Sequence, residues 1–229
     1  MCGRFAITLP PEAMAQMFDA VPGNDVPSGA RHNVCPTQVV AAVTSGEGRR
    51  QVRGMRWGFV PHWYASATDG PLLLNARAES IAEKPAFRAA VRTRRCLIPA
   101  DGFYEWSAGE AGARLPWFVS RADGAPMALA GIWQEWERAD TRLTSCAIVT
   151  CAAGPDMAPI HHREPVVVEP ADWPLWLGEA GHGAALLMRA RPAGVLRAWR
   201  VGVAVNSNRA EGAGLVAPLE AGAGDAVAG

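Results

Sequence analysis

Short runs of apolar, β-branched and aromatic residues recur along the chain and are separated by Gly, Pro and Asp. Short runs of this kind between turn-forming residues are typical of β-strands. Because they neither alternate regularly with helices nor repeat at a fixed period, they disfavour a doubly wound or solenoid fold. The pattern predicts strands at Gly3 to Thr8, Val39 to Val43, Leu72 to Asn75, Cys96 to Pro99, Gly102 to Trp106, Trp117 to Val119, Met127 to Trp133, Cys146 to Thr150, Val166 to Val168 and Val201 to Val205.

Helical spacing of apolar residues is confined to a few short segments. Pro11 to Ala20 carries Met14, Met17 and Phe18 at helical spacing and has proline near its start, which is typical of a helix. The fold class expected is α+β: a single domain of curled, barrel-like antiparallel sheets with a few short helices. Further helical turns are predicted at Phe87 to Val91, Asp172 to Leu177 and Ala184 to Met188.

The composition fits one globular domain. The chain has 229 residues, of which 49% are hydrophobic and 19% charged, enough to bury a substantial core. We expect one domain over residues 1–229, with a flexible Ala/Gly-rich tail over about 216–229. The formal net charge is zero, which argues against a protein that binds nucleic acid through bulk charge. A short basic run, which supports nucleic-acid binding only weakly, contains Arg88, Arg92, Arg94 and Arg95.

The five cysteines are scattered and include no CxxC pair. Neither a disulfide framework nor a cysteine metal site is therefore expected. No secretory signal is visible, and the longest wholly apolar runs, such as Leu72 to Leu74, are too short to cross a membrane. The expected location is the cytoplasm.

The start of the chain, Met1-Cys2, has a second residue small enough for methionine aminopeptidases to accept. Removal of Met1 leaves an α-amine and a thiol on adjacent carbons, with ordinary pKa values of about 8 and about 8.5. An amine condenses with an aldehyde to a Schiff base, and a neighbouring thiol can close on that imine to form a five-membered thiazolidine ring. From the residues alone, the alternative that Cys2 packs as a small buried hydrophobic residue stays open.

Glu105 lies between Tyr104 and Trp106 in the run Asp101 to Trp106. A carboxylate between aromatic rings is expected to be partly desolvated, which raises its pKa and lets it carry a proton near neutral pH. Glu105 could then protonate a sugar ring oxygen or the hydroxyl that leaves a carbinolamine. Plain strand alternation, with Glu105 facing solvent, is equally compatible with the sequence.

The segment Ile160 to Pro165 contains His161, His162 and Arg163. Histidine shuttles protons near neutral pH, and a guanidinium such as that of Arg163 can hold a phosphate. The adjacent histidines also suggest a metal, but neighbouring residues on a strand point to opposite faces and so rarely share one ion. No metal site is expected.

Polar side chains also follow a predicted strand at Leu74 to Glu79. Asn75 offers both a donor and an acceptor for fixing a sugar or carbonyl group. On a strand Asn75 and Arg77 share a face, so that one could position a sugar while the other binds phosphate. The alternative is that Asn75 serves as a helix cap.

Aromatic residues crowd the segment Trp57 to Tyr64, which Gly and Pro interrupt. Exposed rings, such as that of Trp63, stack on unpaired bases without sequence preference. Buried rings are simply core, and the sequence leaves both possibilities open.

Taken together and in order, these segments closely resemble the SOS-response-associated peptidase (SRAP) family. They extend from position 2 to about Pro218, and several motifs in a fixed order are a more specific signal than one short motif. The matching segments are Met1 to Phe5, Arg31 to Val34 with Pro36 to Gln38, Arg56 to Pro61, Asn75 to Glu79, Cys96 to Ala100, Gly102 to Trp106, Ile160 to Arg163 and Val205 to Ser207.

The resemblance implies a mixed α+β, barrel-like sensor of abasic sites in single-stranded DNA. It implies that Cys2 is the nucleophile, which forms a covalent thiazolidine crosslink with the ring-opened sugar and so shields the lesion in the DNA damage response. By the same resemblance Asn75 positions the sugar, Glu105 transfers protons during Schiff-base formation, and His161 assists ring opening and crosslink reversal.

The resemblance also implies a DNA-binding set of residues. Arg4, Arg77 and Arg163 match positions expected near phosphates, and Thr150 is expected near the lesion. Trp63, singled out by the aromatic segment above and not by the resemblance, is also expected to contact DNA. The partner is single-stranded DNA containing abasic sites; we expect a monomer with no cofactor, no metal and no membrane contact, associated with the nucleoid when bound to DNA.

The family name implies a cysteine autopeptidase activity that exposes Cys2, beside a crosslinking, lyase-type activity at abasic sites. Two alternatives stay open at this point: a thiol peptidase with His161 as its base, and a non-covalent binder of single-stranded DNA. The sequence departs from the family pattern at Glu164, where the family usually has Met, and at Cys35, where it more often has a small unreactive residue. Glu164 is expected to pair with Arg163 and weaken a phosphate contact.

Overall fold

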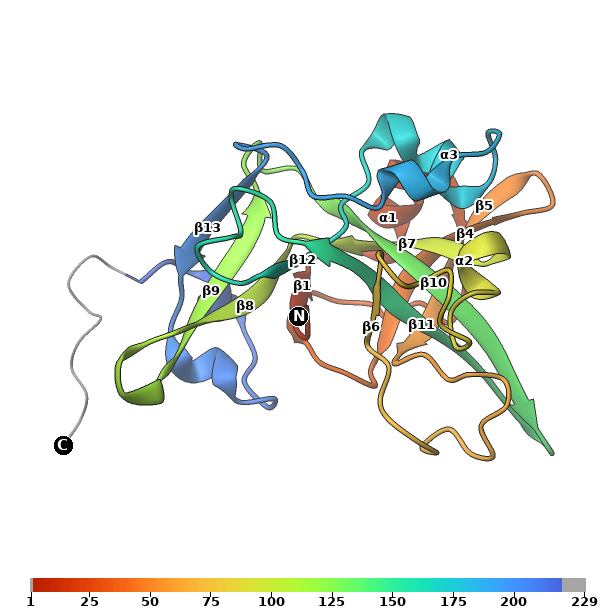
Figure 1. Cartoon of the computed structure of the whole chain (residues 1–229), viewed down its shortest axis with the longest axis horizontal. Helices are drawn as coiled ribbons and strands as arrows, with labels where there is room; N and C mark the ends of the chain where they lie inside the picture. Colours follow the sequence, from red (N-terminus) through yellow and green to blue (C-terminus); the bar gives the residue numbers. More distant parts are fainter. Residues whose placement is uncertain (1, 220–229) are drawn as a thin grey trace.

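The computed structural model describes residues 2–219, which form mainly β-strands arranged in two sheets (Figure 1). One sheet has five strands in the order β13-β9-β8-β1-β3. Every pairing in it is antiparallel. Its strands are β1 (Phe5–Ile7), β3 (Arg31–Val34), β8 (Gly102–Ala108), β9 (Arg114–Arg121) and β13 (Leu196–Arg200).

The other sheet closes on itself. β10 pairs with β7 and β11, β4 pairs with β7 and β5, and a parallel pairing of β5 with β11 completes a ring. The buried side chains of Leu97, Ile132 and Ile148 belong to the core around which this ring closes. The strands of this sheet are β2 (Ala20–Pro22), β4 (Val39–Gly46), β5 (Arg49–Trp57), β6 (Asn75–Arg77), β7 (Arg95–Ala100), β10 (Met127–Arg138), β11 (Thr141–Ala152) and β12 (Arg163–Pro165).

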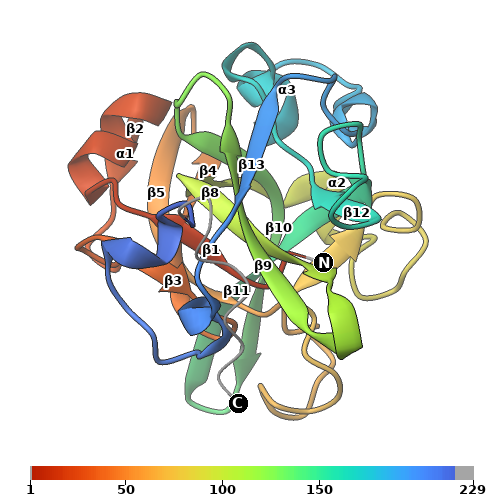
Figure 2. The same cartoon turned by 90° about the vertical axis from the view of Figure 1, so that its left-hand side faces the viewer.

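The helices are short and cover one side of the barrel, as the two perpendicular views in Figure 1 and Figure 2 show. α1 (Pro11–Phe18) has proline at its first turn and ends at Asp19, whose φ of 49° is left-handed. Its Phe18 ring packs 4.4 Å from the Trp173 ring of α3 (Trp173–Leu177). The other helical segments are α2 (Ala90–Thr93) and 3₁₀ turns at Glu110–Gly112, Pro170–Asp172, Ala184–Leu187, Val203–Asn206 and Ala213–Val216.

The fold class predicted from the sequence is confirmed, although three pairings are parallel rather than antiparallel: β2–β5, β5–β11 and β6–β11. Two predicted strands are wrong. Val166 to Val168 follows β12 and makes only an isolated bridge at Val167, and Val201 to Val205 lies after β13 and contains a 3₁₀ turn. Val166 to Val168, Val201 and Val205 are apolar because they are buried, whereas Val203 is exposed, and burial alone does not distinguish a strand from a turn.

The strand predicted at Leu72 to Asn75 begins later, at Asn75. The predicted tail of about 216–229 falls mostly outside the described residues. Within them, Pro218 bridges to Val201 and the backbone N–H of Leu219 donates to the Arg200 carbonyl (2.9 Å), so residues 216–219 contact β13. No helix among the described residues is long and apolar enough to cross a membrane.

Candidate active site

Cys2 lies where the two sheets meet. It precedes β1, its side chain is 0% exposed, and it belongs to the same buried cluster as the barrel core. Asn75 reaches it from β6, because its Nδ2 donates a hydrogen bond to the Cys2 carbonyl (2.9 Å). The amino-terminal segment is thereby fixed to the barrel as well as to the five-stranded sheet.

Burial raises the pKa of the Cys2 thiol, and the nearby negative charge of Glu105 raises it further. The backbone N–H of Arg4 points at the sulfur and lowers this pKa, but by less. The thiol is therefore protonated at neutral pH, and its sulfur becomes a strong nucleophile only when a neighbouring group removes the proton.

Two groups able to transfer protons lie beside Cys2. Glu105 on β8 is 3% exposed, which rules out the solvent-facing alternative, and its Oε1 is 4.0 Å from Nδ1 of His161. His161 lies near the end of the connection between β11 and β12, where its Nδ1 is close to both the N–H (3.0 Å) and the carbonyl oxygen (3.1 Å) of Arg163. Because one of these groups accepts and the other donates, the ring has a backbone partner whether or not Nδ1 carries a proton.

Asn75 is a strand residue and not a helix cap. β6 runs parallel to β11, with Asn75 opposite Ile148 and Arg77 opposite Thr150. Its Oδ1 is buried and has no hydrogen-bond partner among the described residues. A buried acceptor without a donor is costly, so a ligand hydroxyl or amine at this point would be stabilised.

Two hollows open on either side of Cys2. The Glu105 hollow, of about 500 Å³, is lined by Gly3, Arg4, Glu105, Trp106, Arg114, His161 and Asn206. The Arg77 hollow, of about 450 Å³, is lined by Trp63, Leu73, Asn75, Arg77, Ser80, Lys84, Pro85, Ala86 and Phe87. Cys2 lies between them, because Gly3 follows it in one wall and Asn75, which holds its carbonyl, is in the other.

The predicted DNA-binding residues differ in how many hydrogen bonds their side chains already make within the protein. Arg77 is exposed, and Trp63 is 46% exposed. Arg4 is nearly buried and donates to Asn33 Oδ1 (2.7 Å), to the Val205 carbonyl (2.9 Å) and to Asn208 Oδ1. Arg4 therefore holds the carboxyl-terminal part of the chain against β1.

The Arg163 side chain also has partners within the protein. It forms a bidentate pair with Glu79 (2.8 and 2.9 Å) and donates to the carbonyl of the fully buried Thr150 (2.7 Å). The predicted pairing of Arg163 with Glu164 is wrong, because adjacent strand residues point to opposite sides. Glu164 instead accepts from the backbone N–H groups of Gly154 (2.8 Å) and Arg191 (3.2 Å).

Sequence reasoning gave no role to two residues that shape the site, Glu79 and Asn206, and it gave Trp106 only the role of an aromatic neighbour of Glu105. Trp106 lies under the guanidinium groups of Arg4 (5.9 Å) and Arg114 (5.1 Å), and its Nε1 donates to Asn206 Oδ1 (2.7 Å). All three belong to segments recognised in the sequence, but their partners lie far away in the chain, so no local pattern could pair them.

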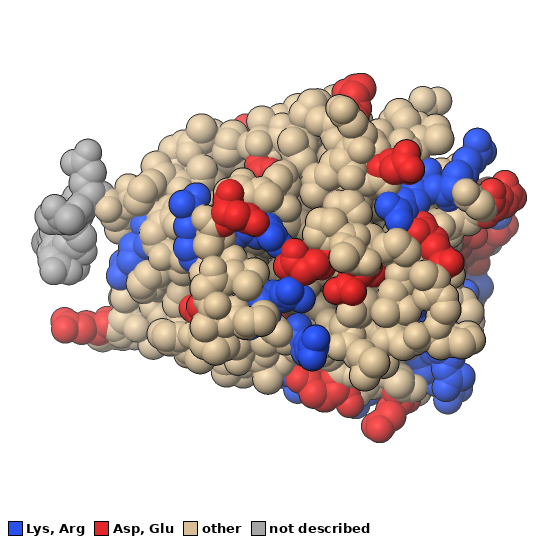
Figure 3. Space-filling view, turned by 90° about the horizontal axis from the view of Figure 1, so that it is seen from above, with Lys and Arg blue, Asp and Glu red and all other residues tan. Residues whose placement is uncertain are grey.

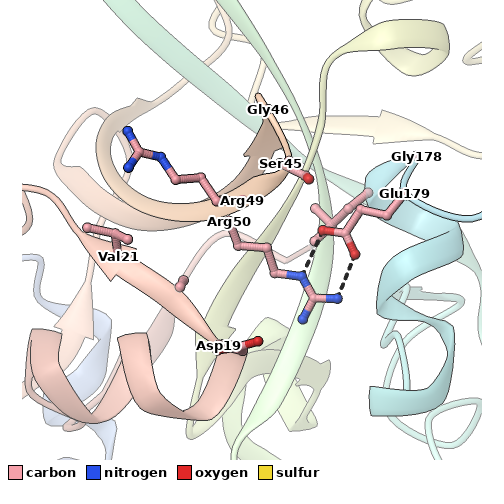
Figure 4. A pocket seen from close by; sticks show the side chains of 11 residues that line it. Asp19, Val21, Ser45, Gly46, Arg49, Arg50, Gly178 and Glu179 are labelled. Atoms are coloured by element: carbon pink, nitrogen blue, oxygen red, sulfur yellow. Dashed lines mark hydrogen bonds and ion pairs between the residues drawn. The ribbon is translucent and has the colours of Figure 1, made fainter.

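A larger hollow of about 840 Å³ lies away from these residues, between β2, the β4–β5 turn and the end of α3 (Figure 4). There Arg50 donates to both carboxylate oxygens of Glu179 (2.8 and 2.7 Å) and to the Phe18 carbonyl (2.9 Å). Since Arg50 and Glu179 neutralise each other, we interpret these contacts as structural: they connect α1, β5 and the end of α3.

Metal ligands and surface charge add little to this site. Among residues 2–219 no group of three or more His, Cys, Asp or Glu side chains is placed to hold a metal ion, and the five buried cysteines are free thiols. Figure 3 shows basic and acidic side chains intermixed over the face it presents. Because the formal net charge of the chain is also zero, any attraction for a charged ligand must come from local groups.

Comparison with known proteins gives consistent matches. A family model described as SOS response associated peptidase (SRAP) matches residues 1–208. The abasic site processing protein YoaM of Bacillus subtilis is 34% identical over 173 residues, which are 73% of this chain and 75% of that protein. The abasic site processing protein YedK of Escherichia coli is 30% identical over 228 residues, covering 96% of this chain and 100% of that protein.

Solved structures show the same fold. A protein from Bacteroides thetaiotaomicron superposes with a TM-score of 0.84 at 22% identity, over 95% of this chain and 100% of the other. A protein from Bordetella bronchiseptica gives a TM-score of 0.74 at 25% identity, over 88% of this chain and 100% of the other.

Proposed function

Because the chain belongs to the SOS response associated peptidase (SRAP) family, we propose that it processes abasic sites in DNA. It binds single-stranded DNA at the lesion and, after removal of Met1, bonds to the ring-opened sugar through the amine and thiol of Cys2. The product is a thiazolidine that shields the lesion in the DNA damage response.

The observation that carries this proposal is the meeting of Cys2, Asn75, Glu105 and His161 at one point. They come from four separate segments, and they are linked by the Asn75–Cys2 hydrogen bond, the charge of Glu105 beside the thiol and the 4.0 Å approach of Glu105 to His161. Such convergence of a nucleophile with two proton-transfer groups and a polar anchor is what a condensation with an aldehyde requires.

The first step joins nitrogen to carbon. Once His161 has helped to open the sugar ring, the Cys2 amine attacks the aldehyde carbon C1′ to give a carbinolamine, and its hydroxyl leaves as water when Glu105 supplies a proton. Asn75, whose Oδ1 lacks a donor among the described residues, accepts a hydrogen bond from a sugar hydroxyl or from the amine itself. The product of this step is an imine.

The second step joins sulfur to the same carbon. The Cys2 thiol gives up its proton to Glu105 or His161, the sulfur attacks C1′, and the imine nitrogen takes a proton to become an amine. One water has then been lost for two bonds formed, and no oxidant or reductant is needed. Because burial keeps the thiol protonated, a neighbouring base is required at this step.

DNA would enter through the Arg77 hollow. Arg77 and Trp63 are exposed there and can contact a phosphate and a base. Arg163 and Arg4, with their present partners, would contact DNA only through remaining donors, and in the proposed complex they mainly fix Thr150 and the Glu105 hollow. We further propose that the protein acts as a monomer.

The same thiol supports a second proposed activity, cleavage of the peptide bond that precedes Cys2. His161 would serve as its base, and the cleavage would expose the amine that crosslinking needs. A chain carrying a short extension before Cys2 tests this activity: self-processing that Cys2→Ala abolishes supports it, and an intact extension contradicts it.

The crosslink is tested with an oligonucleotide that holds one abasic site. Wild-type protein is expected to give an adduct that survives heat and detergent and resists high salt, and mass spectrometry should find Cys2 at its amino terminus. Cys2→Ala should give no such adduct, and Cys2→Ser, which keeps the amine but not the thiol, should give only a reversible one. An active protein that retains Met1, or an equally stable adduct with Cys2→Ala, contradicts the proposal.

A further inference from the structure

Three cationic side chains follow one another at four-residue intervals after β6: Lys84, Arg88 and Arg92. The backbone between them turns helically, because Lys84 N–H donates to the Ser80 carbonyl (3.0 Å) and Arg88 N–H donates to the Lys84 carbonyl (2.9 Å). Residues four apart on helical turns lie on the same side. Figure 1 shows this yellow segment leading from β6 to α2.

The opposite side of the segment is fixed to the core. Phe87 is 7% and Ala90 1% exposed, and the N–H of Val91 donates to the Phe87 carbonyl (2.9 Å). Apolar residues at this spacing form the buried face of helical turns. The cationic stripe of Lys84, Arg88 and Arg92 is therefore anchored to the core from behind and faces solvent.

The structure separates the basic run of the sequence into two groups. Arg94 donates to Gln134 (2.8 Å), and Arg95 donates to the carbonyls of Val91 (2.9 Å), Arg92 and Trp176. Arg88 and Arg92 are exposed, and their side chains have no hydrogen bond or ion pair with any residue in 2–219. The first group stabilises the fold, while the second leaves its charge to solvent.

The stripe continues the Arg77 hollow. Lys84 lines that hollow together with Arg77 and Asn75. Four residues of helix rise about 6 Å, a spacing that the phosphates of an extended single strand can match. Glu83 is the nearest acid in the sequence, but one residue along a helix turns about 100° away, so it does not interrupt the stripe.

We propose that Lys84, Arg88 and Arg92 form a track for the phosphates of the strand that leaves the Arg77 hollow on one side of the lesion. This inference rests on the proposed function. The track contacts phosphates only, so it adds affinity without sequence preference. It also makes the footprint unequal on the two sides of the lesion.

The test compares Arg88→Gln/Arg92→Gln with the matched control Arg49→Gln/Arg142→Gln, which removes the same charge from exposed positions elsewhere. The probes are two oligonucleotides of equal length carrying a tetrahydrofuran lesion, which has no aldehyde and cannot form an adduct. One probe has the lesion near its 5′ end and the other near its 3′ end. The readout is the Kd at a series of salt concentrations.

The expected result is a roughly tenfold weaker Kd for one probe only, with a salt slope shallower by about 1.4, since each lost contact with a single strand removes ~0.7. The control pair should leave that probe unchanged. An equal loss of affinity for both probes, or the same loss in the control variant, would overturn the proposed track. So would a wild-type protein that binds neither probe. If the double variant weakens binding of one probe only, but Cys2 forms no adduct with a true abasic site, the proposed chemistry fails and the track stands.

Discussion

The Glu105 hollow and the Arg77 hollow lie on either side of Cys2 but are built in opposite ways. In the first, Arg4 and Trp106 are held by Asn33, Val205, Asn208 and Asn206. In the second, Arg77 and Trp63 are exposed and make no polar side-chain contact with the rest of residues 2–219. The side chains of the first hollow are thus fixed in advance, as the proposed proton transfer requires, while the second hollow leaves its charge and aromatic surface for a ligand.

The largest expected effect, and the strongest test of this difference between the two hollows, comes from removing the acid of the Glu105 hollow. Glu105→Gln keeps the shape but cannot transfer a proton, so adduct formation should slow by at least about 100-fold, the range of a general acid–base group. Binding of a tetrahydrofuran-containing oligonucleotide should stay within about twofold of wild type. An unchanged crosslinking rate would mean that the hollow does not perform the chemistry.

A smaller effect is expected on the other side. Trp63→Ala should weaken DNA binding about tenfold, because stacking on a base contributes about 1–3 kcal/mol. The crosslinking rate at saturating DNA should not change, since Trp63 is outside the Glu105 hollow. Leu186→Ala, which alters an exposed apolar residue outside both hollows, is the control. A lower rate at saturation for Trp63→Ala would show that the two sides are not separate.

The smallest expected effect concerns how stability changes with pH. Glu164 fixes the connection that carries His161 by accepting from the backbone N–H groups of Gly154 and Arg191. Burial raises the pKa of its carboxyl, these two donors lower the pKa by less, and the charge of Asp156 raises it. The native state then holds this proton more tightly than the unfolded chain, so the contribution of Glu164 to stability falls as pH rises from about 4.3 through the raised pKa.

Glu164→Gln removes this contribution. The free energy of unfolding of wild type minus that of Glu164→Gln should therefore decrease from acid to neutral pH, as urea unfolding at several pH values would measure. A difference that increases over this range would show that the carboxylate is held mainly by its two backbone donors.

Local sequence signals were sufficient for some parts of the molecule and not for others. Apolar runs predicted most of the barrel strands, but β5 was missed because Arg49, Arg53 and Arg56 interrupt its apolar positions. Those arginines face outward or pack beside aromatic rings, as Arg53 does over Trp133 (5.2 Å). The parallel pairing of β5 with β11, which closes the barrel, could not be predicted without that strand.

The candidate site shows the same division. Cys2, Glu105 and His161 could be singled out from residue types and their neighbours, and their roles stay predictions. The partners that occupy Arg4 and Arg163 could not, because Val205 lies 201 residues from Arg4 and Glu79 lies 84 residues from Arg163. Pairings over such distances are set by which strands lie together within each sheet, and no local pattern records this.

The burial of Cys2 has a consequence for the timing of synthesis. An aminopeptidase must bind an extended terminus in its active site. The folded protein presents no such terminus at Cys2, which has no accessible surface. The hydrogen bonds from Arg4 to Val205 and Asn208 form only after residue 208 has left the ribosome. In the proposed function, removal of Met1 by an aminopeptidase would therefore act on the nascent chain, and a protein that folded first could expose the Cys2 amine only by the proposed self-cleavage.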